Sequence, residues 1–150
     1  MKLSKLLENK TNEIIKIDSN KSVFEAIQLL NKHKIGSLLV MNENKKLEGI
    51  ITERDILFKC LENERDNYKT KIAEVMTSKE KLIIGTADDK LSYAMRVMVS
   101  KKVRHLPIVD NENVIGLLSI GDILKEVLDQ SETEVKLLRE YVKNPYGINL

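Results

Sequence analysis

The chain has 150 residues, of which 42% are hydrophobic and 32% charged, so it can form one domain or two small ones around a real core. Its charges nearly cancel to a net +2, which argues against the strong field that nonspecific binding to nucleic acid or to a membrane surface requires. The first residues are too polar for a signal peptide and no apolar run approaches membrane-spanning length, so a cytoplasmic location is expected.

The elements predicted first along the chain are a short strand and a helix. Ile14, Ile15 and Ile17 indicate the strand. Ser22 follows as a helix N-cap, with Glu25 completing a capping box. The helix then carries apolar residues at helical spacing: Val23, Ala26, Ile27 and Leu30.

A hairpin and a closing helix are predicted next. The apolar runs 37–41 and 47–52 flank the polar segment ENKK, which is typical of two strands joined by a short turn. The closing helix is expected to begin near Glu53 and to give way to the charged, non-periodic segment 62–71, the expected linker.

The second half of the chain predicts the same order of elements. Residues 82–84 indicate a strand, and a helix follows with Leu91, Ala94, Met95 and Met98 at core spacing. The runs 105–109 and 114–119 predict a second hairpin, and another closing helix comes after it.

A separate amphipathic tail helix is predicted after Leu128. Ser131 is its expected N-cap, Val135, Leu138 and Val142 have helical spacing, and Asn144-Pro145 is the expected stop. Two roles remain open for this tail, packing on its own module or contact with a second subunit.

The two halves are copies of one unit. GIITERDIL (49–57) recurs as GLLSIGDIL (116–124), and the likeness extends backwards, with Ala26 matching Ala94 and Val40 matching Ile108. Since each copy of a repeat is one structural unit, the two must pack on each other. The expected division is a first motif over residues 1–64, a second motif over 65–130 and a C-terminal helix and tail over 131–150.

This order of elements resembles a tandem pair of CBS domains, the regulatory module of the cystathionine beta-synthase type. The most specific parts of the resemblance are four segments. Two are the glycine-led segments at 49–57 and 116–124, and the others are AEVMT (73–77) and VRHLPIVD (103–110). The resemblance extends from about Leu3 to Leu128. It implies an α/β (α+β) fold, with two tandem β-α-β-β-α motifs packed as one pseudo-two-fold module. It also implies two clefts for an adenosine-containing ligand, with AMP, ADP or ATP expected and NAD(H) or S-adenosylmethionine as alternatives.

Two matching pairs of residues are candidate ligand contacts. Thr52 with Asp55, and Ser119 with Asp122, stand where a strand ends and a helix begins. The local explanation is a helix cap. The alternative is that each carboxylate accepts ribose hydroxyls while the helix start faces a phosphate. The resemblance implies the second role for Asp55 and Asp122.

The remaining candidates come from the resemblance. Arg104 and His105 correspond to basic residues that often reach phosphates, and we expect Arg104 to act with Ser119 and Asp122 in the second cleft. For His105 a structural role and a ligand contact both stay open. The first copy has Gly36 and Ser37 there, so its cleft would need a cation such as Arg54 or Lys59, or would be a poorer nucleotide site. Adenine contacts are expected from the strands that open each copy, at Ile17 and Ile84.

The sequence predicts a binding protein and no enzyme. The single cysteine, Cys60, has the place of a half-buried structural thiol, and neither a metal site nor a catalytic set is predicted. We expect a ligand sensor that forms a homodimer and passes its bound state to an unknown regulated protein or to its own dimer interface. The alternative is a structural or protein-interaction module with empty clefts.

Overall fold

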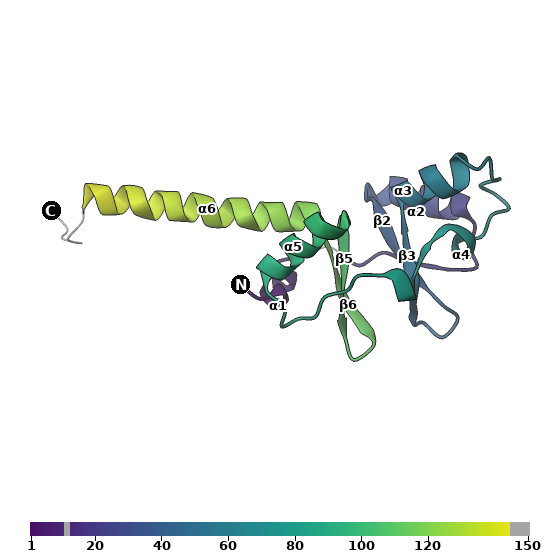
Figure 1. The fold of residues 1–150 in the computed structure, drawn as a ribbon, viewed down its shortest axis with the longest axis horizontal. Helices are drawn as coiled ribbons and strands as arrows, with labels where there is room; N and C mark the ends of the chain where they lie inside the picture. The colour runs from purple at the N-terminus through teal and green to yellow at the C-terminus, as the bar shows by residue number, and fades with distance from the viewer. Residues whose placement is uncertain (11–12, 145–150) are drawn as a thin grey trace.

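Two lobes and a long C-terminal helix make up the computed structural model, which describes residues 1–10 and 13–144 (Figure 1). The first lobe contains β1 (Lys16–Asp18), α2 (Val23–His33), β2 (Ser37–Met41), β3 (Leu47–Thr52), α3 (Glu53–Asp55) and the π-helix η1 (Ile56–Leu61). The second lobe contains α5 (Leu91–Lys101), β5 (His105–Asp110), β6 (Asn113–Ser119) and α6 (Ile120–Lys143), while the 3₁₀ turn η2 (Lys79–Lys81) contacts β3 of the first lobe. The predicted α+β architecture is confirmed.

Each copy is preceded by short leading elements. α1 (Leu3–Glu8) comes before the first copy, and α4 (Ile72–Val75) and β4 (Thr77–Ser78) come before the second. The first lobe's sheet has the order β1-β2-β3-β4, with β1 parallel to β2 and the other pairs antiparallel. The second lobe has the hairpin β5-β6. Both hairpins shift register at matching positions of the repeat, after Val40 and after Ile108, which confirms that the copies share one backbone plan.

The predicted cap of α2 is present. Glu25 N–H donates to Ser22 Oγ (3.2 Å), and Ser22 N–H donates to Glu25 Oε2 (2.9 Å). These two bonds satisfy donors that a helix start would otherwise leave unpaired.

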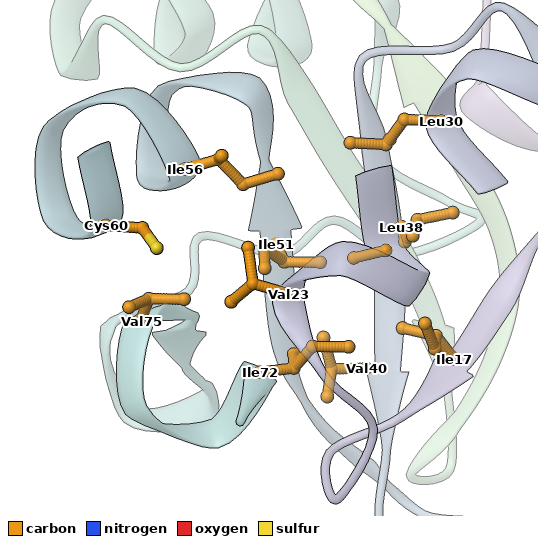
Figure 2. Packing of buried hydrophobic residues seen from close by; sticks show 11 residues of the cluster. Ile17, Val23, Leu30, Leu38, Val40, Ile51, Ile56, Cys60, Ile72 and Val75 are labelled. Atoms are coloured by element: carbon orange, nitrogen blue, oxygen red, sulfur yellow. The ribbon is translucent and has the colours of Figure 1, made fainter. Parts of the chain in front are cut away.

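Each lobe has its own hydrophobic core. In the first lobe, α2 packs on the strands and on η1, and Cys60 is fully buried there (Figure 2). The Cys60 thiol donates to Asn67 Oδ1 (3.1 Å), as expected for a structural residue. The core of the second lobe consists of Leu3, Leu6, Leu91, Ala94, Met98, Leu106, Ile108, Leu118 and Ile123.

The two cores exchange the segments that lead into them. Leu3 and Leu6 of α1 precede the first copy, yet they are buried in the second core. Ile72 and Val75 of α4 precede the second copy, yet they are buried in the first core. Matching backbone bridges, Lys2 with Lys90 and Ser22 with Lys71, hold the exchanged segments in place. The two packing units therefore interlock across the expected boundary at 64/65, which stays a prediction.

The structure corrects two predicted elements. Residues 82–84 are not a strand, because η2 turns the chain immediately before them, and the backbone joins the sheet only at Gly85, whose N–H donates to the Pro107 carbonyl (2.9 Å). The separate tail helix capped by Ser131 is also wrong, since α6 is one continuous helix that passes through this residue. The predicted stop falls partly outside the described residues, at Pro145, although α6 does end before Asn144.

Met95 also departs from its predicted core position, because it is 38% exposed while its neighbours Leu91, Ala94 and Met98 face the second core.

Candidate functional site: two unequal clefts between the lobes

A cavity of about 540 Å³ lies where the end of β3 meets the second lobe, and we call it the Asp55 cleft. Its apolar lining includes Ile50, Leu82, Ile83 and Val103. The Asp55 carboxylate and the Thr77 hydroxyl supply polar groups to the same cavity. A pocket of this size and composition is typical of sites for small organic ligands.

Asp55 is held firmly at the start of α3. Its Oδ2 accepts from Thr52 N–H (3.0 Å), and its own N–H donates to Thr52 Oγ1 (3.2 Å), which is the expected capping box. Its Oδ1 accepts from Thr77 Oγ1 (3.2 Å) and pairs with Lys59 Nζ (2.8 Å). The residue is only 6% exposed. The carboxylate is therefore oriented before any ligand arrives, by contacts from three directions.

Cations from both lobes line the Asp55 cleft. Arg54 comes from the first copy, whereas Arg104 comes from the second. Lys81 and Lys102 join them. These four cations outnumber the two carboxylates that line the cleft, Asp55 and Glu53, so positive charge predominates there. An arginine can bind a phosphate with two parallel hydrogen bonds.

A second cavity of about 340 Å³, the Asp122 cleft, lies at the start of α6. Ser119 and Asp122 repeat the capping box, with Ser119 N–H donating to Asp122 Oδ2 (2.8 Å) and Asp122 N–H donating to Ser119 Oγ (3.2 Å). The side chain of Lys10 also lies in this cleft. Lys10 Nζ lies 2.9 Å from Asp122 Oδ2 and donates to the Leu117 carbonyl as well.

The Lys10 contact changes the titration of Asp122. Desolvation by itself would raise the pKa of the carboxyl group. Hydrogen bonds from the Ser119 N–H and from Lys10, together with the Lys10 charge, outweigh desolvation and hold the pKa below its usual value. Asp122 is thus an ionised carboxylate that already has a cation as partner.

His105 and Gly36 lie between the two clefts and line both. Burial is the main cause that lowers the pKa of His105, and the charge of Lys10 lowers it further. A Cβ on Gly36 would come within 3.2 Å of Glu53 Oε1 and 3.4 Å of His105 Cε1, so a larger residue would crowd this junction.

The structure rearranges the predicted sites. Thr52, Arg54 and Asp55 lie together in the Asp55 cleft, and Ser119 with Asp122 forms the other cleft. Arg104 belongs to the Asp55 cleft, which corrects its expected partnership with Ser119 and Asp122. Its carbonyl accepts from Ile120 N–H (2.8 Å), so its backbone lies beside α6, yet its side chain lines the opposite cleft.

The cleft that lacks an arginine at this position is therefore the Asp122 cleft, which Gly36 and Ser37 line. The predicted adenine contacts lie elsewhere: Ile17 is buried in the first core, and Ile84 lines neither cleft. Their neighbours Ile15 and Ile83 do line clefts, one in each.

Two residues at these sites escaped the sequence analysis. Lys10 lies 112 positions from Asp122, and no local pattern joins the two. Thr77 ends the AEVMT segment, and its pairing with Ile50 in the β3-β4 ladder brings it to Asp55. In residues 1–10 and 13–144, no group of three potential metal ligands occurs, and no helix is long and apolar enough to cross a membrane.

Comparison with known proteins gives a consistent result. The family model described as "CBS domain" matches residues 9–62 and 72–129. The CBS domain-containing protein CBSX3, mitochondrial, of Arabidopsis thaliana is 35% identical over 127 residues, which is 83% of this chain and 62% of that protein. The chain thus spans less than two thirds of this relative.

Solved structures share the fold. A putative signal-transduction protein with CBS domains from Burkholderia ambifaria superposes with a TM-score of 0.81 at 32% identity, covering 86% of this chain and 95% of that one. The CBS domain pair of protein MJ0100, in complex with 5'-methylthioadenosine and S-adenosyl-L-methionine, has a TM-score of 0.74 at 28% identity, covering 87% and 98%.

Proposed function

The chain belongs to the CBS domain family, and from this premise we propose that it is a regulatory module that binds an adenosine-containing ligand in its Asp55 cleft. The observation that carries the proposal is the combination of groups in this cleft. An oriented carboxylate, an apolar wall and four cations from both lobes line one cavity. A nucleotide offers ribose hydroxyls, a flat base and phosphates, which complement these three kinds of group.

The relative with bound ligands supports the class of compound. The MJ0100 domain pair binds 5'-methylthioadenosine and S-adenosyl-L-methionine, both of which contain adenosine. The cations of the Asp55 cleft favour phosphorylated members of this class, so AMP, ADP and ATP are the first candidates. S-adenosylmethionine and NAD(H) are the alternatives.

The Asp122 cleft is the weaker candidate in this proposal. Both carboxylates already pair with a lysine, Asp55 with Lys59 (2.8 Å) and Asp122 with Lys10 (2.9 Å). The Asp122 cleft is the smaller one, however, and none of its lining residues is an arginine that could bind a phosphate. We therefore expect one occupied cleft per chain at moderate ligand concentration.

A homodimer is the second part of the proposal. Leu57 and Leu61 of η1 are exposed, and so are Leu124 and Leu128 at the matching positions of α6. Since exposed aliphatic side chains at repeated positions favour a shared interface, we expect a second copy to cover them. Leu57 and the exposed Phe58 also line the Asp55 cleft, which connects ligand binding to the interface. A regulated protein would respond to the resulting change at the dimer interface.

Calorimetric titration of the purified chain with AMP, ADP, ATP, NADH and S-adenosylmethionine tests ligand binding. We expect binding of at least one compound, weakened by Arg104→Gln and unaffected by Lys10→Gln, which removes a cation from the other cleft. Failure of all five to bind at millimolar concentration would refute the sensor and favour an interaction module. Sensitivity to Lys10→Gln alone would move the site to the Asp122 cleft.

A further inference from the structure

The outer part of α6 extends beyond the second lobe as a single exposed helix (Figure 1). Residues 131–144 are all exposed. Closer to the lobe, Ile123 is buried in the second core and Val127 packs against it, while Leu124 and Leu128 lie on another face and are exposed. This second face continues along the helix without cover from the described residues.

A seam of aliphatic side chains, interrupted only by Ser131, runs along this face with the spacing of a coiled coil. It consists of Leu124, Leu128, Ser131, Val135, Leu138 and Val142, at alternating steps of four and three residues. In heptad terms, Leu128, Val135 and Val142 occupy a positions, and Leu124, Ser131 and Leu138 occupy d positions. Within parallel coiled coils, valine at a with leucine at d favours the two-stranded form. At 1.5 Å per residue, the seam is about 27 Å long.

We propose that the seam is covered by the same seam of a second copy, in a parallel two-stranded coiled coil. The inference rests on the homodimer proposed above and is independent of ligand binding. It adds an orientation to that homodimer, since the outer ends of both α6 helices lie together.

The charges beside the seam favour the parallel orientation. Glu134 is at a g position and Arg139 at the following e position, so in a parallel pair each glutamate faces the partner's arginine, twice by symmetry. A fully overlapped antiparallel pair would instead face Glu134 with its own counterpart, and Lys125 with Arg139. Such like-charge contacts oppose association.

Two substitutions at neighbouring positions provide a matched test. Leu138 and Leu137 are similarly exposed, 63% and 59%, but only Leu138 belongs to the seam. Cys60 is the single cysteine and is fully buried, so an introduced thiol on α6 is the accessible one. Under mild oxidation we expect Ser131→Cys and Leu138→Cys each to cross-link two full chains, because a parallel pair brings every seam residue beside its counterpart. Leu137→Cys, which points away, is the control.

A second pair of substitutions tests the packing of the seam separately from the relative orientation of the two α6 helices. In the Ser131→Cys chain, adding Leu138→Glu should reduce cross-linking to the level of Leu137→Cys, whereas adding Leu137→Glu should leave it unchanged. Cross-linking at one seam position alone would indicate an antiparallel pair and overturn the proposal. A dimer in sedimentation with no seam cross-link would refute the coiled coil but retain the homodimer. A monomeric parent chain would refute both.

Discussion

Neutralising Asp55 tests whether its carboxylate serves a ligand or serves only the fold. Asp55→Asn keeps the size of the side chain and one oxygen acceptor, but it removes the charge that pairs with Lys59 at 2.8 Å. It also weakens the acceptor for Thr52 N–H and for the Thr77 hydroxyl. Asp122→Asn is the natural control, because Asp122 occupies the matching position of the repeat and makes the same capping box.

The expected loss of stability is moderate. A lost capping interaction costs about 1 kcal/mol, and the Lys59 pair adds less than that because the lysine side chain is half exposed to water. For a chain of this length, 1 kcal/mol corresponds to a fall in melting temperature of about 2–4 °C. Asp122→Asn should cost a similar amount.

The two variants should differ in ligand binding. A hydrogen bond to a charged group contributes about 1.5–3 kcal/mol. Its loss at Asp55 should therefore weaken the binding of the best adenosine compound roughly 10-fold to 150-fold. Asp122→Asn should leave the affinity within about 2-fold, within the ordinary uncertainty of such contributions.

Calorimetry below the melting temperature of each variant measures the affinity of folded protein, and thermal unfolding without ligand measures the stability separately. An Asp55→Asn chain that is less stable but binds with the parent's affinity would show that Asp55 is a helix cap alone. Loss of binding in Asp122→Asn instead would show that the cleft has been assigned to the wrong copy.

Three further predictions concern stability. Lys10→Met should destabilise the protein by about 1 kcal/mol at pH 7, because it removes the partner of Asp122. Since folding lowers the pKa of Asp122, this stabilisation is present above the ordinary pKa of the carboxyl group and is lost as pH falls through the folded pKa. The difference in melting temperature between parent and variant should therefore disappear in acid, and a difference that stays constant with pH would contradict this prediction. Gly49→Ala should lower the melting temperature more than Gly116→Ala, since the new methyl group meets the Thr77 backbone carbonyl in the first case and the flexible end of Leu7 in the second; equal losses would argue against this reason. Ser22→Ala should cost about 1 kcal/mol in urea unfolding while Ser131→Ala costs nothing, because only the first serine caps a helix, and a cost at Ser131 would indicate a break in α6.

Local patterns predicted the elements that depend on neighbouring residues. The cap of α2, the two hairpins and the start of α3 each rest on groups a few positions apart, so the sequence contains the whole interaction. The internal repeat further predicted that the chain folds into two similar lobes that pack on each other. Ser131 shows the limit of this reasoning, because its S-x-x-E pattern is that of a cap. No glycine or proline interrupts residues 122–144, so the helix that begins at Ile120 continues through it.

The amino-acid sequence alone thus determined the two copies, their order of elements and the carboxylate at the start of each closing helix, because all of these follow from short-range spacing and self-similarity. Only the tertiary structure decided which lobe each leading segment enters and which cation meets which carboxylate. Arg104 lines the cleft of Asp55, and Lys10 reaches Asp122 from 112 residues away. The physical reason is that these contacts depend on how two nearly equal lobes pack, and side chains at the lobe interface can reach across to the other copy's cleft.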